Sequence, residues 1–277
     1  MSAVSNGDLP RPVSSRDGRD AGTTDGCGGG GARATGERTE AEDAKAPDLT
    51  VVVPVMNEEA GIASFARDLL SAVDALGLRS EIIFVDDHST DDTHSLLAEL
   101  GVSVVRHPHN RGYGASLKTG IQRATGRFVC IIDADHELAP TDIVRLLPHA
   151  AEYDMVVGAR VGEGARVFPW HQRIAKGIVC RLLRASFGQE ILDLNSGLRV
   201  FPRELAEEYL PLLPDGYSFT STITLAMLLD GRRLRYTPVS YAPRIGETKV
   251  RIFSYTVRFI GGYIRVLLRH RQRAKRA

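Results

Sequence analysis

Two aspartates follow directly after an apolar run in the middle of the chain, and their position raises the first chemical question. The run Val129–Ile132 has the composition of a buried strand, and Asp133 and Asp135 come next with only Ala134 between them. A carboxylate beside a protein core is costly unless something positive pairs with it. Residues two apart in a strand point the same way, so both carboxylates could share one partner. The simpler alternative is a solvated turn.

The elements that would position this pair are strands alternating with helices. Continuous apolar runs predict strands, and apolar residues at helical spacing predict helices between them. The predicted strands are 49–55, 81–87, 102–107, 127–133 and 154–160, and the predicted helices are 61–76, 91–100, 114–124 and 141–151. Such alternation predicts an α/β fold with a mostly parallel sheet and right-handed crossovers.

Polar residues collect where four of these strands end. The four stretches are 54–59 (PVMNEE), 85–93 (VDDHSTDDT), 107–114 (HPHNRGYG) and 133–137 (DADHE). They are rich in Asp, Asn and Gly, which suits close approach of backbone to a ligand. Ligands of such sheets bind beyond the carboxyl ends of the strands, so we expect one site built from these four loops.

The composition divides the 277 residues into three parts. Residues 1–47 hold few large apolar side chains and predict a disordered tail. Residues 48–250 form the predicted catalytic domain, and residues 251–277 form a predicted basic amphipathic helix and tail. The three cysteines are widely spaced and make no metal-binding pattern, which favours a reducing compartment.

Four motifs in order resemble those of the family 2 glycosyltransferases, which have the GT-A fold. The motifs are VVVPVMNEE, IIFVDDHSTDDT, HNRGYGASLKTGIQRATGRFVCIIDAD and LNSGLRVF. The resemblance is good over 49–161 and extends to about residue 250. Within the family, the chain is most similar to polyprenyl-phosphate sugar synthases of the dolichol-phosphate mannose synthase type.

The resemblance implies a divalent cation, Mg²⁺ or Mn²⁺, as the partner of Asp133 and Asp135. Both metals prefer oxygen ligands, usually one or two carboxylates and substrate phosphates. The cation would carry the diphosphate of a nucleotide sugar and neutralise the charge of that leaving group. Glu137 stands where the family often has Gln, so a third carboxylate ligand is possible there. A solvated turn is the other reading of Glu137.

The other loops take donor-binding roles by the same resemblance. Pro54, Asn57 and Glu58 match the motif that lines the ribose and base. Asp86 or Asp87 matches the aspartate that reads the base, since a carboxylate can accept from a ring N–H. The two glycines Gly112 and Gly114 are expected to let the third loop pack under the donor, or else to make only a tight turn.

Cations of the second half resemble those that hold phosphates in the subgroup. This role is carried over to Arg160, Arg173, Lys176, Ser196, Arg199 and Lys249. Arg173 is also counted with Asp133 and Asp135 as a catalytic residue. Arginine suits phosphate because its planar fork binds two oxygens. A basic, solvated helix face is the alternative for Lys176.

The acceptor is expected to be a polyprenyl phosphate. A phosphate monoester is largely ionised at pH 7 and attacks without a general base, and the stretch 215–228 (DGYSFTSTITLAML) shows no clear base. A soluble sugar or secondary-metabolite hydroxyl is the alternative acceptor. The resemblance to family 2 implies that the enzyme inverts the anomeric centre.

Membrane attachment is expected from the C-terminal segment. It places Arg251, Arg258 and Arg265 seven residues apart among apolar residues, which is typical of a helix on an anionic membrane surface. The predicted location is therefore cytoplasmic, at the inner face of the cell membrane. A receiver-like signalling domain is a remote alternative, and no nucleic-acid partner is predicted.

Overall fold

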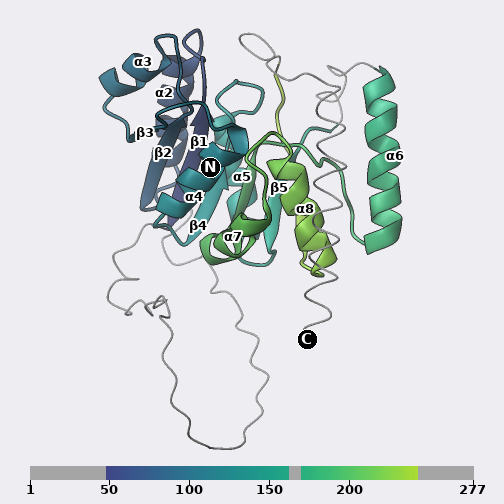
Figure 1. Cartoon of the computed structure of the whole chain (residues 1–277). Coiled ribbons are helices and arrows are strands. Elements are labelled where there is room, and N and C mark those ends of the chain that lie inside the picture. Colours follow the sequence, from purple (N-terminus) through teal and green to yellow (C-terminus); the bar gives the residue numbers. More distant parts are fainter. Residues whose placement is uncertain (1–47, 162–169, 243–277) are drawn as a thin grey trace, which may run out of the picture.

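The computed structural model describes residues 48–161 and 170–242, with the backbone alone for residues 170–176. Within these residues, seven strands form one sheet in the order β3-β2-β1-β4-β6-β5-β7 (Figure 1). The strands are β1 (Leu49–Val55), β2 (Ser80–Asp86), β3 (Val104–Arg106), β4 (Phe128–Ile131), β5 (Met155–Ala159), β6 (Arg199–Pro202) and β7 (Leu234–Pro238). All neighbouring pairs are parallel except those of β6, which runs antiparallel to both β4 and β5.

Helices cover both faces of the sheet. The α-helices are α2 (Ile62–Asp74), α3 (Thr93–Glu99), α4 (Tyr113–Arg123), α5 (Ile143–Leu146), α6 (Trp170–Phe187), α7 (Arg203–Tyr209) and α8 (Phe219–Leu229). Short 3₁₀ turns lie at η1 (Pro140–Asp142), η2 (Leu147–His149) and η4 (Leu210–Leu212). Helices α2, α3 and α5 pack on one face, and α4, α7 and α8 pack on the other. The sheet is therefore the middle layer of three.

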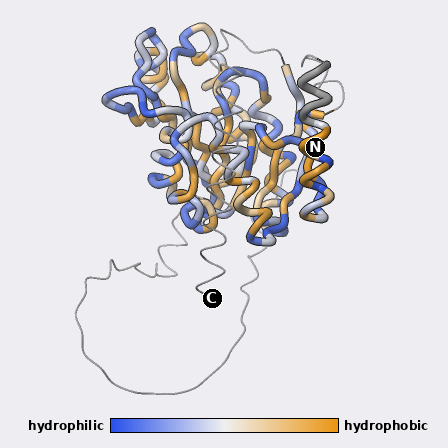
Figure 2. The backbone as a smooth tube through the Cα atoms, turned by 45° about the vertical axis from the view of Figure 1, so that its right-hand side comes forward, coloured by the Kyte–Doolittle hydropathy of each residue, from blue (hydrophilic) through white to orange (hydrophobic). Residues whose placement is uncertain are grey.

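The alternation of side chains along β1 explains why both faces carry a core. Val51 and Val53 pack with Phe65 of α2, whereas Val52 points to the other face and packs with Leu117 of α4. A strand covered on both sides can be apolar at every position, and all seven residues of β1 are buried. Figure 2 shows these apolar segments in the interior of the domain, with hydrophilic segments in the connecting loops.

The predicted α/β fold with a mostly parallel sheet is confirmed, with local corrections. The strand predicted over 102–107 is only three residues long, and the strand predicted to reach Asp133 ends at Ile131. The helix predicted over 141–151 is broken into 3₁₀ and α segments, with Pro148 near the start of η2. Proline lacks an N–H and interrupts the helical ladder there. β6 and β7 were not predicted.

Three predictions lie outside the described residues. They are the tail 1–47, the helix 251–277 and the position of Lys249. In the part of the chain that the structure does describe, no helix combines the length and the apolar character needed to cross a bilayer.

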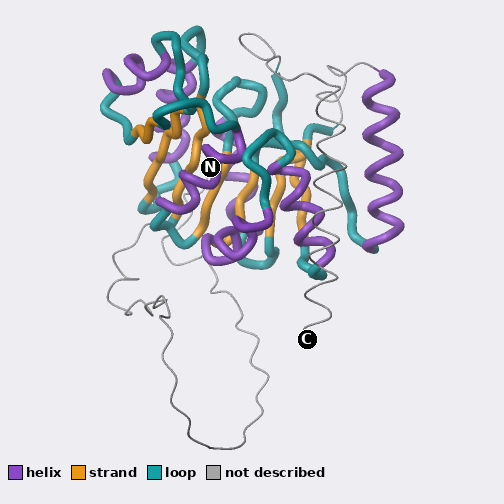
Figure 3. Tube along the Cα trace, viewed as in Figure 1, coloured by secondary structure: helices purple, strands orange, loops and turns teal. Residues whose placement is uncertain are grey.

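The loops that follow β1, β2 and β4 gather at one edge of the sheet, the upper edge in Figure 3. Positive φ angles occur in these loops at three residues other than glycine: Asn57 (51°), His88 (65°) and His136 (60°). Such angles cost free energy and cluster at binding and catalytic sites. The backbone therefore singles out the same edge that the polar sequence pattern predicts.

Candidate functional site

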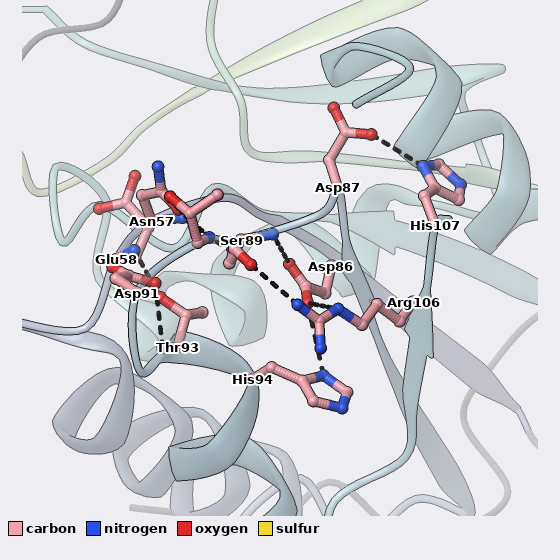
Figure 4. Close-up of polar contacts among 11 residues, drawn as sticks. Asn57, Glu58, Asp86, Asp87, Ser89, Asp91, Thr93, His94, Arg106 and His107 are labelled. Atoms are coloured by element: carbon pink, nitrogen blue, oxygen red, sulfur yellow. Dashed lines mark hydrogen bonds and ion pairs between the residues drawn. The ribbon is translucent and has the colours of Figure 1, made fainter. Parts of the chain in front are cut away.

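The loops after β1 and β2 are joined by hydrogen bonds between side chains and backbone (Figure 4). The Asn57 backbone N–H donates to Ser89 Oγ at 2.9 Å, and the side-chain oxygen Asn57 Oδ1 accepts from the Thr90 backbone N–H at 2.8 Å. The Glu58 N–H donates to Thr93 Oγ1 at 2.7 Å. Pro54 lies inside β1, opposite Val85 of β2, and is buried. The predicted donor residues Asn57 and Glu58 thus lie at the edge, and Pro54 lies below it.

Asp86 ends β2 and is completely buried. Its Oδ1 accepts from the Ser89 N–H at 2.8 Å, and its Oδ2 lies 3.2 Å from Arg106 Nε and 3.4 Å from His94 Nδ1 (Figure 4). Arg106 Nη2 also donates to the Ser89 carbonyl. These contacts hold the loop after β2 in place. A role of Asp86 in reading the base stays a prediction.

The Asp87 side chain binds the backbone of the third loop, which follows β3, rather than the loop after β2 in which Asp87 itself lies. Its Oδ1 accepts from the Arg111 N–H at 2.8 Å, and its Oδ2 accepts from the Gly112 N–H at 2.7 Å. The buried His107 ring lies between Asp87 Oδ1 (2.8 Å from Nδ1) and Thr119 Oγ1 (2.9 Å from Nε2). This network fixes the start of α4, and a base contact from Asp87 also stays a prediction.

The two glycines of the third loop serve packing against a turn far along the chain. A Cβ at Gly112 would lie 2.5 Å from the Asp215 carbonyl oxygen, and one at Gly114 would lie 2.2 Å from that of Pro214. Gly112 also has a φ of 101°, which favours glycine. The close neighbour of both glycines is therefore the turn 214–216, a partner that the sequence did not indicate; contact with the donor stays a prediction.

Asp133 and Asp135 lie in the loop after β4, so the argument that they share one strand face is wrong. The Tyr113 hydroxyl donates to Asp133 Oδ1 at 2.8 Å, and Asp135 Oδ1 accepts from the Glu137 N–H at 3.1 Å. Burial raises the pKa of Asp133 to about 7, and the negative charge of Asp135 adds to the increase. The two carboxylates are thus close enough to repel each other.

The Glu137 side chain lies beside the guanidinium of Arg160. Its carboxylate lies 3.5 Å from Arg160 Nη1. The Asp193 carboxylate accepts hydrogen bonds from Nε of the same guanidinium at 2.7 Å and from its Nη2 at 3.0 Å. Burial opposes the charged form, but the negative charge of Asp193 outweighs it and raises the pKa of Arg160. Among the described residues, no three His, Cys, Asp or Glu side chains converge as a metal site. Glu137 thus joins an ion-pair network with Arg160 and Asp193, and its role as a third metal ligand stays a prediction.

Two predicted phosphate ligands lie inside the fold. Ser196 and Arg199 are completely buried. Ser196 Oγ accepts from the Leu198 N–H, and the Arg199 guanidinium donates to the carbonyls of Leu194 and Ser196 and to Thr224 Oγ1. The prediction that they contact an acceptor phosphate is therefore corrected, because β6 begins at Arg199 and directs this side chain into the core. The α6 residues Arg173 and Lys176 have side chains outside the described part.

A family comparison decides the class of this site. The family model described as Glycosyl transferase family 2 matches residues 50–210, which is more than half of the chain and includes the loops after β1, β2, β3 and β4. The chain belongs to glycosyl transferase family 2. The resemblance predicted from the four motifs is therefore confirmed at the level of the family, and a receiver-like domain has no support.

Two relatives show how far the likeness extends. The hexosyltransferase Agl6 of low-salt glycan biosynthesis from Haloferax volcanii is 30% identical over 214 residues, which cover 75% of this chain and 51% of that protein. The chain thus spans about half the length of this curated relative. Glucosyl-3-phosphoglycerate synthase from Mycobacterium tuberculosis, solved with Mn²⁺, uridine diphosphate and phosphoglyceric acid, is 25% identical, with a TM-score of 0.61 and coverage of 83% and 80%. Neither is named as a polyprenyl-phosphate synthase, so that closer resemblance stays a prediction.

The side chains of this family 2 site fit a divalent cation. Asp133 and Asp135 offer hard carboxylate oxygens at the carboxyl edge of the sheet, and a cation bound there would relieve the repulsion that raises the pKa of Asp133. Mg²⁺ is usually bound by one or two protein carboxylates, with substrate phosphates completing its coordination shell.

Sequence reasoning missed Tyr113, Asp193 and Gly197. A Cβ at Gly197 would lie 1.9 Å from Asp133 Oδ2, so the loop before β6 lies directly against the first aspartate. The partners of these residues are 20 to 64 positions away in the chain, and no local pattern indicates them. A glycine inside the quoted LNSGLRVF motif was the one available signal for such a close approach.

Proposed function

We propose that the chain is an inverting glycosyltransferase that uses Mg²⁺ or Mn²⁺ and moves a hexose from a nucleotide diphosphate sugar to a phosphate acceptor. The observation that carries this proposal is the pair Asp133 and Asp135 at the carboxyl edge of a family 2 fold. The structural relative was solved with uridine diphosphate and Mn²⁺, which supports a UDP-sugar before a GDP-sugar.

The chain's own residues would bind and orient the donor. Asp133 and Asp135 would hold the cation, which supplies electrostatic stabilisation of the diphosphate leaving group. Asn57 and Glu58 lie at the same edge, with the loop after β2 joined to them by hydrogen bonds. These fixed loops would place the anomeric carbon for attack, because orientation of the reacting groups lowers the barrier.

A phosphate acceptor is favoured because the described part of the second half offers no evident general base. Helix α8 carries threonines and a serine where an acid would be sought, and they are buried. The nearby Asp215 is paired with Lys118 at 2.6 Å. An ionised phosphate oxygen attacks without losing a proton, so a phosphate acceptor requires no general base. Arg160, which is ion-paired with Asp193, is proposed to bind the acceptor phosphate. The same role is proposed for Arg173, Lys176 and Lys249.

Two sources of phosphate are considered. Polyprenyl phosphate is the first, and it implies work at the inner face of the membrane. A soluble phosphorylated molecule is the second, because the structural relative was solved with phosphoglyceric acid. That acid carries a hydroxyl as well as a phosphate, and the proposal for this chain is attack by the phosphate oxygen. A hydroxyl acceptor ranks below both, since it requires the base that α8 does not supply.

One assay tests donor and acceptor together. The native chain is incubated with GDP-, UDP- and dTDP-hexoses and Mn²⁺, and with one of four acceptor conditions: undecaprenyl phosphate, phosphoglyceric acid, a free sugar or no acceptor. Nucleotide release that rises with one phosphate acceptor, together with a product in which the hexose is linked through a phosphate oxygen, supports the proposal. NMR spectra of the product report this linkage and whether the anomeric centre is inverted. Release that no phosphate acceptor increases, while a free sugar does increase it, contradicts the phosphate-acceptor proposal.

The outer surface of α6 supports a membrane-bound acceptor. The side chains of Ile178 and Leu182 are 54% and 64% exposed on neighbouring turns, and Arg181 and Arg184 are exposed beside them. Apolar and basic positions alternate along this helix, which stands at the edge of the domain (Figures 1 and 2). The sequence of α6 contains no Asp or Glu. An acid-free helix with exposed apolar and basic residues is typical of one that lies on an anionic bilayer.

The double substitution Ile178→Glu with Leu182→Glu should reduce binding to phosphatidylglycerol vesicles by about tenfold or more. It removes two inserting apolar side chains, each worth roughly 1.5–3 kcal/mol when fully buried, and adds charge that repels the bilayer. Vesicle co-sedimentation measures the effect. Leu70→Glu, at an exposed leucine of α2, is the matched control and should bind like the native chain. Equal binding by the double variant would exclude α6 from membrane contact.

A further inference from the structure

Tyr113 occupies a special position between the third loop and the metal-binding aspartates. It is the first residue of α4, directly after Gly112, and its hydroxyl donates to Asp133 Oδ1 at 2.8 Å. The bond joins residues 20 positions apart, from two different loops of the site. A hydrogen bond to an ionised carboxylate is among the stronger ones in proteins. Tyr113 is therefore placed to fix the direction of the Asp133 carboxylate.

The ring of Tyr113 is itself held in place. It stacks on Tyr217, with centroids 5.6 Å apart and planes at 15°. Tyr217 follows the turn 214–216, whose Asp215 carbonyl accepts from the Ala115 N–H at 3.1 Å. Gly112 lies so close to this turn that no Cβ fits between them. The turn, the ring pair and the start of α4 thus form one support, which restricts the motion of the Tyr113 hydroxyl.

Asp133 is also confined from the opposite direction. Its carboxylate lies against Gly197, where any Cβ would come within 1.9 Å of Oδ2. The loop that carries Gly197 is fixed by Arg199, which donates to the carbonyls of Leu194 and Ser196. With the tyrosine hydroxyl at Oδ1 and the glycine at Oδ2, the carboxylate has little freedom to rotate.

We infer that Tyr113, backed by Tyr217, is a positioning residue that orients Asp133 to bind the cation carrying the donor diphosphate. This inference rests on the proposed function. A carboxylate that receives a hydrogen bond on one oxygen is already oriented when a metal binds its other oxygen. Loss of such a hydrogen-bond donor commonly weakens metal binding about 10- to 100-fold. The Tyr113 hydroxyl contacts Asp133, so its effect should pass through metal affinity.

The test is a titration of Mn²⁺ into the protein with uridine diphosphate, with free Mn²⁺ followed by electron paramagnetic resonance. Tyr113→Phe keeps the stacked ring and removes only the hydroxyl, and it should weaken Mn²⁺ binding about 10- to 100-fold. Binding of uridine diphosphate in EDTA should stay the same. Tyr217→Leu keeps the hydroxyl bond but removes its support, and should weaken Mn²⁺ binding by a smaller factor, about threefold.

A matched control comes from the other end of the domain. Tyr209 donates to Asp230 Oδ2 at 2.8 Å, the same kind of bond at the same length, between α7 and the end of α8. Tyr209→Phe should leave Mn²⁺ affinity unchanged. If Tyr113→Phe proves unfolded in a thermal melt, Tyr217→Leu alone decides the inference.

The outcomes separate the inference from the function on which it rests. Native protein that binds no Mn²⁺ in the presence of nucleotide overturns the proposed function. Native protein that binds Mn²⁺, with Tyr113→Phe binding it equally well, overturns the inference alone. Weaker nucleotide binding by Tyr113→Phe in EDTA, with unchanged Mn²⁺ affinity, would also overturn it, since the hydroxyl would then serve the nucleotide instead.

Discussion

Exchange of Asp135 for asparagine should reduce hexose transfer by roughly a hundredfold or more at saturating donor. The amide keeps the shape of the side chain but loses the negative charge that would hold the cation. Neutralisation of a leaving group by a metal is worth several kcal/mol, and each 1.36 kcal/mol is about a factor of ten in rate. Single-turnover transfer with excess Mn²⁺ measures the loss.

The control for this substitution is Asp74→Asn, an exposed carboxylate at the end of α2. It changes the net charge equally and should transfer at the native rate. An Asp135→Asn variant that is folded and transfers within threefold of the native rate would contradict the assignment of this loop as the metal-binding loop.

Replacement of Arg199 by leucine should lower the free energy of unfolding by about 3 kcal/mol. The substitution leaves the carbonyls of Leu194 and Ser196 and the hydroxyl of Thr224 without their donor inside the core. A buried polar group that loses its partner costs about 1–3 kcal/mol, and part of the sum is recovered because burial of the arginine charge is itself unfavourable. Burial lowers the pKa of Arg199, which expresses that cost.

Urea unfolding followed by circular dichroism measures this loss. Arg79→Leu is the control, because Arg79 makes an exposed ion pair with Asp48 at 3.3 Å, and such pairs contribute less than about 1 kcal/mol. An unchanged unfolding midpoint for Arg199→Leu would contradict a structural role. The folded fraction should also bind Mn²⁺ more weakly, since the loop held by Arg199 carries Gly197 against Asp133.

The parts of the fold that were predicted correctly are those written in local patterns. β1, β2, β4 and β5 are continuous apolar runs, and the helices between them show apolar residues at helical spacing. β6 (RVFP) and β7 (LRYTP) mix arginine, threonine and proline with apolar residues, so neither appears as a continuous apolar run. The antiparallel pairing of β6 with β4 joins residues more than 65 positions apart, so tertiary contacts rather than local sequence decide it.

The candidate site shows the same division. Asp133 and Asp135 could be found because a pair of acids after an apolar strand is conspicuous in the sequence. The sequence could not predict in this way which arginines lie at the site and which lie in the core. Arg160 and Arg199 look alike in the sequence, yet the first lies in an ion-pair network at the site and the second in the core. Only the three-dimensional register of β5 and β6 separates them.

The central claim is that a cation held by Asp133 and Asp135 binds the diphosphate of the donor, and calorimetry of uridine diphosphate binding tests it most directly. Titrations are made in Mn²⁺ and in EDTA, with the native chain and with the double variant Asp133→Asn, Asp135→Asn. We predict that EDTA weakens native binding at least tenfold, and that Mn²⁺ does not strengthen binding to the double variant. Equal affinity in all four titrations would contradict the claim.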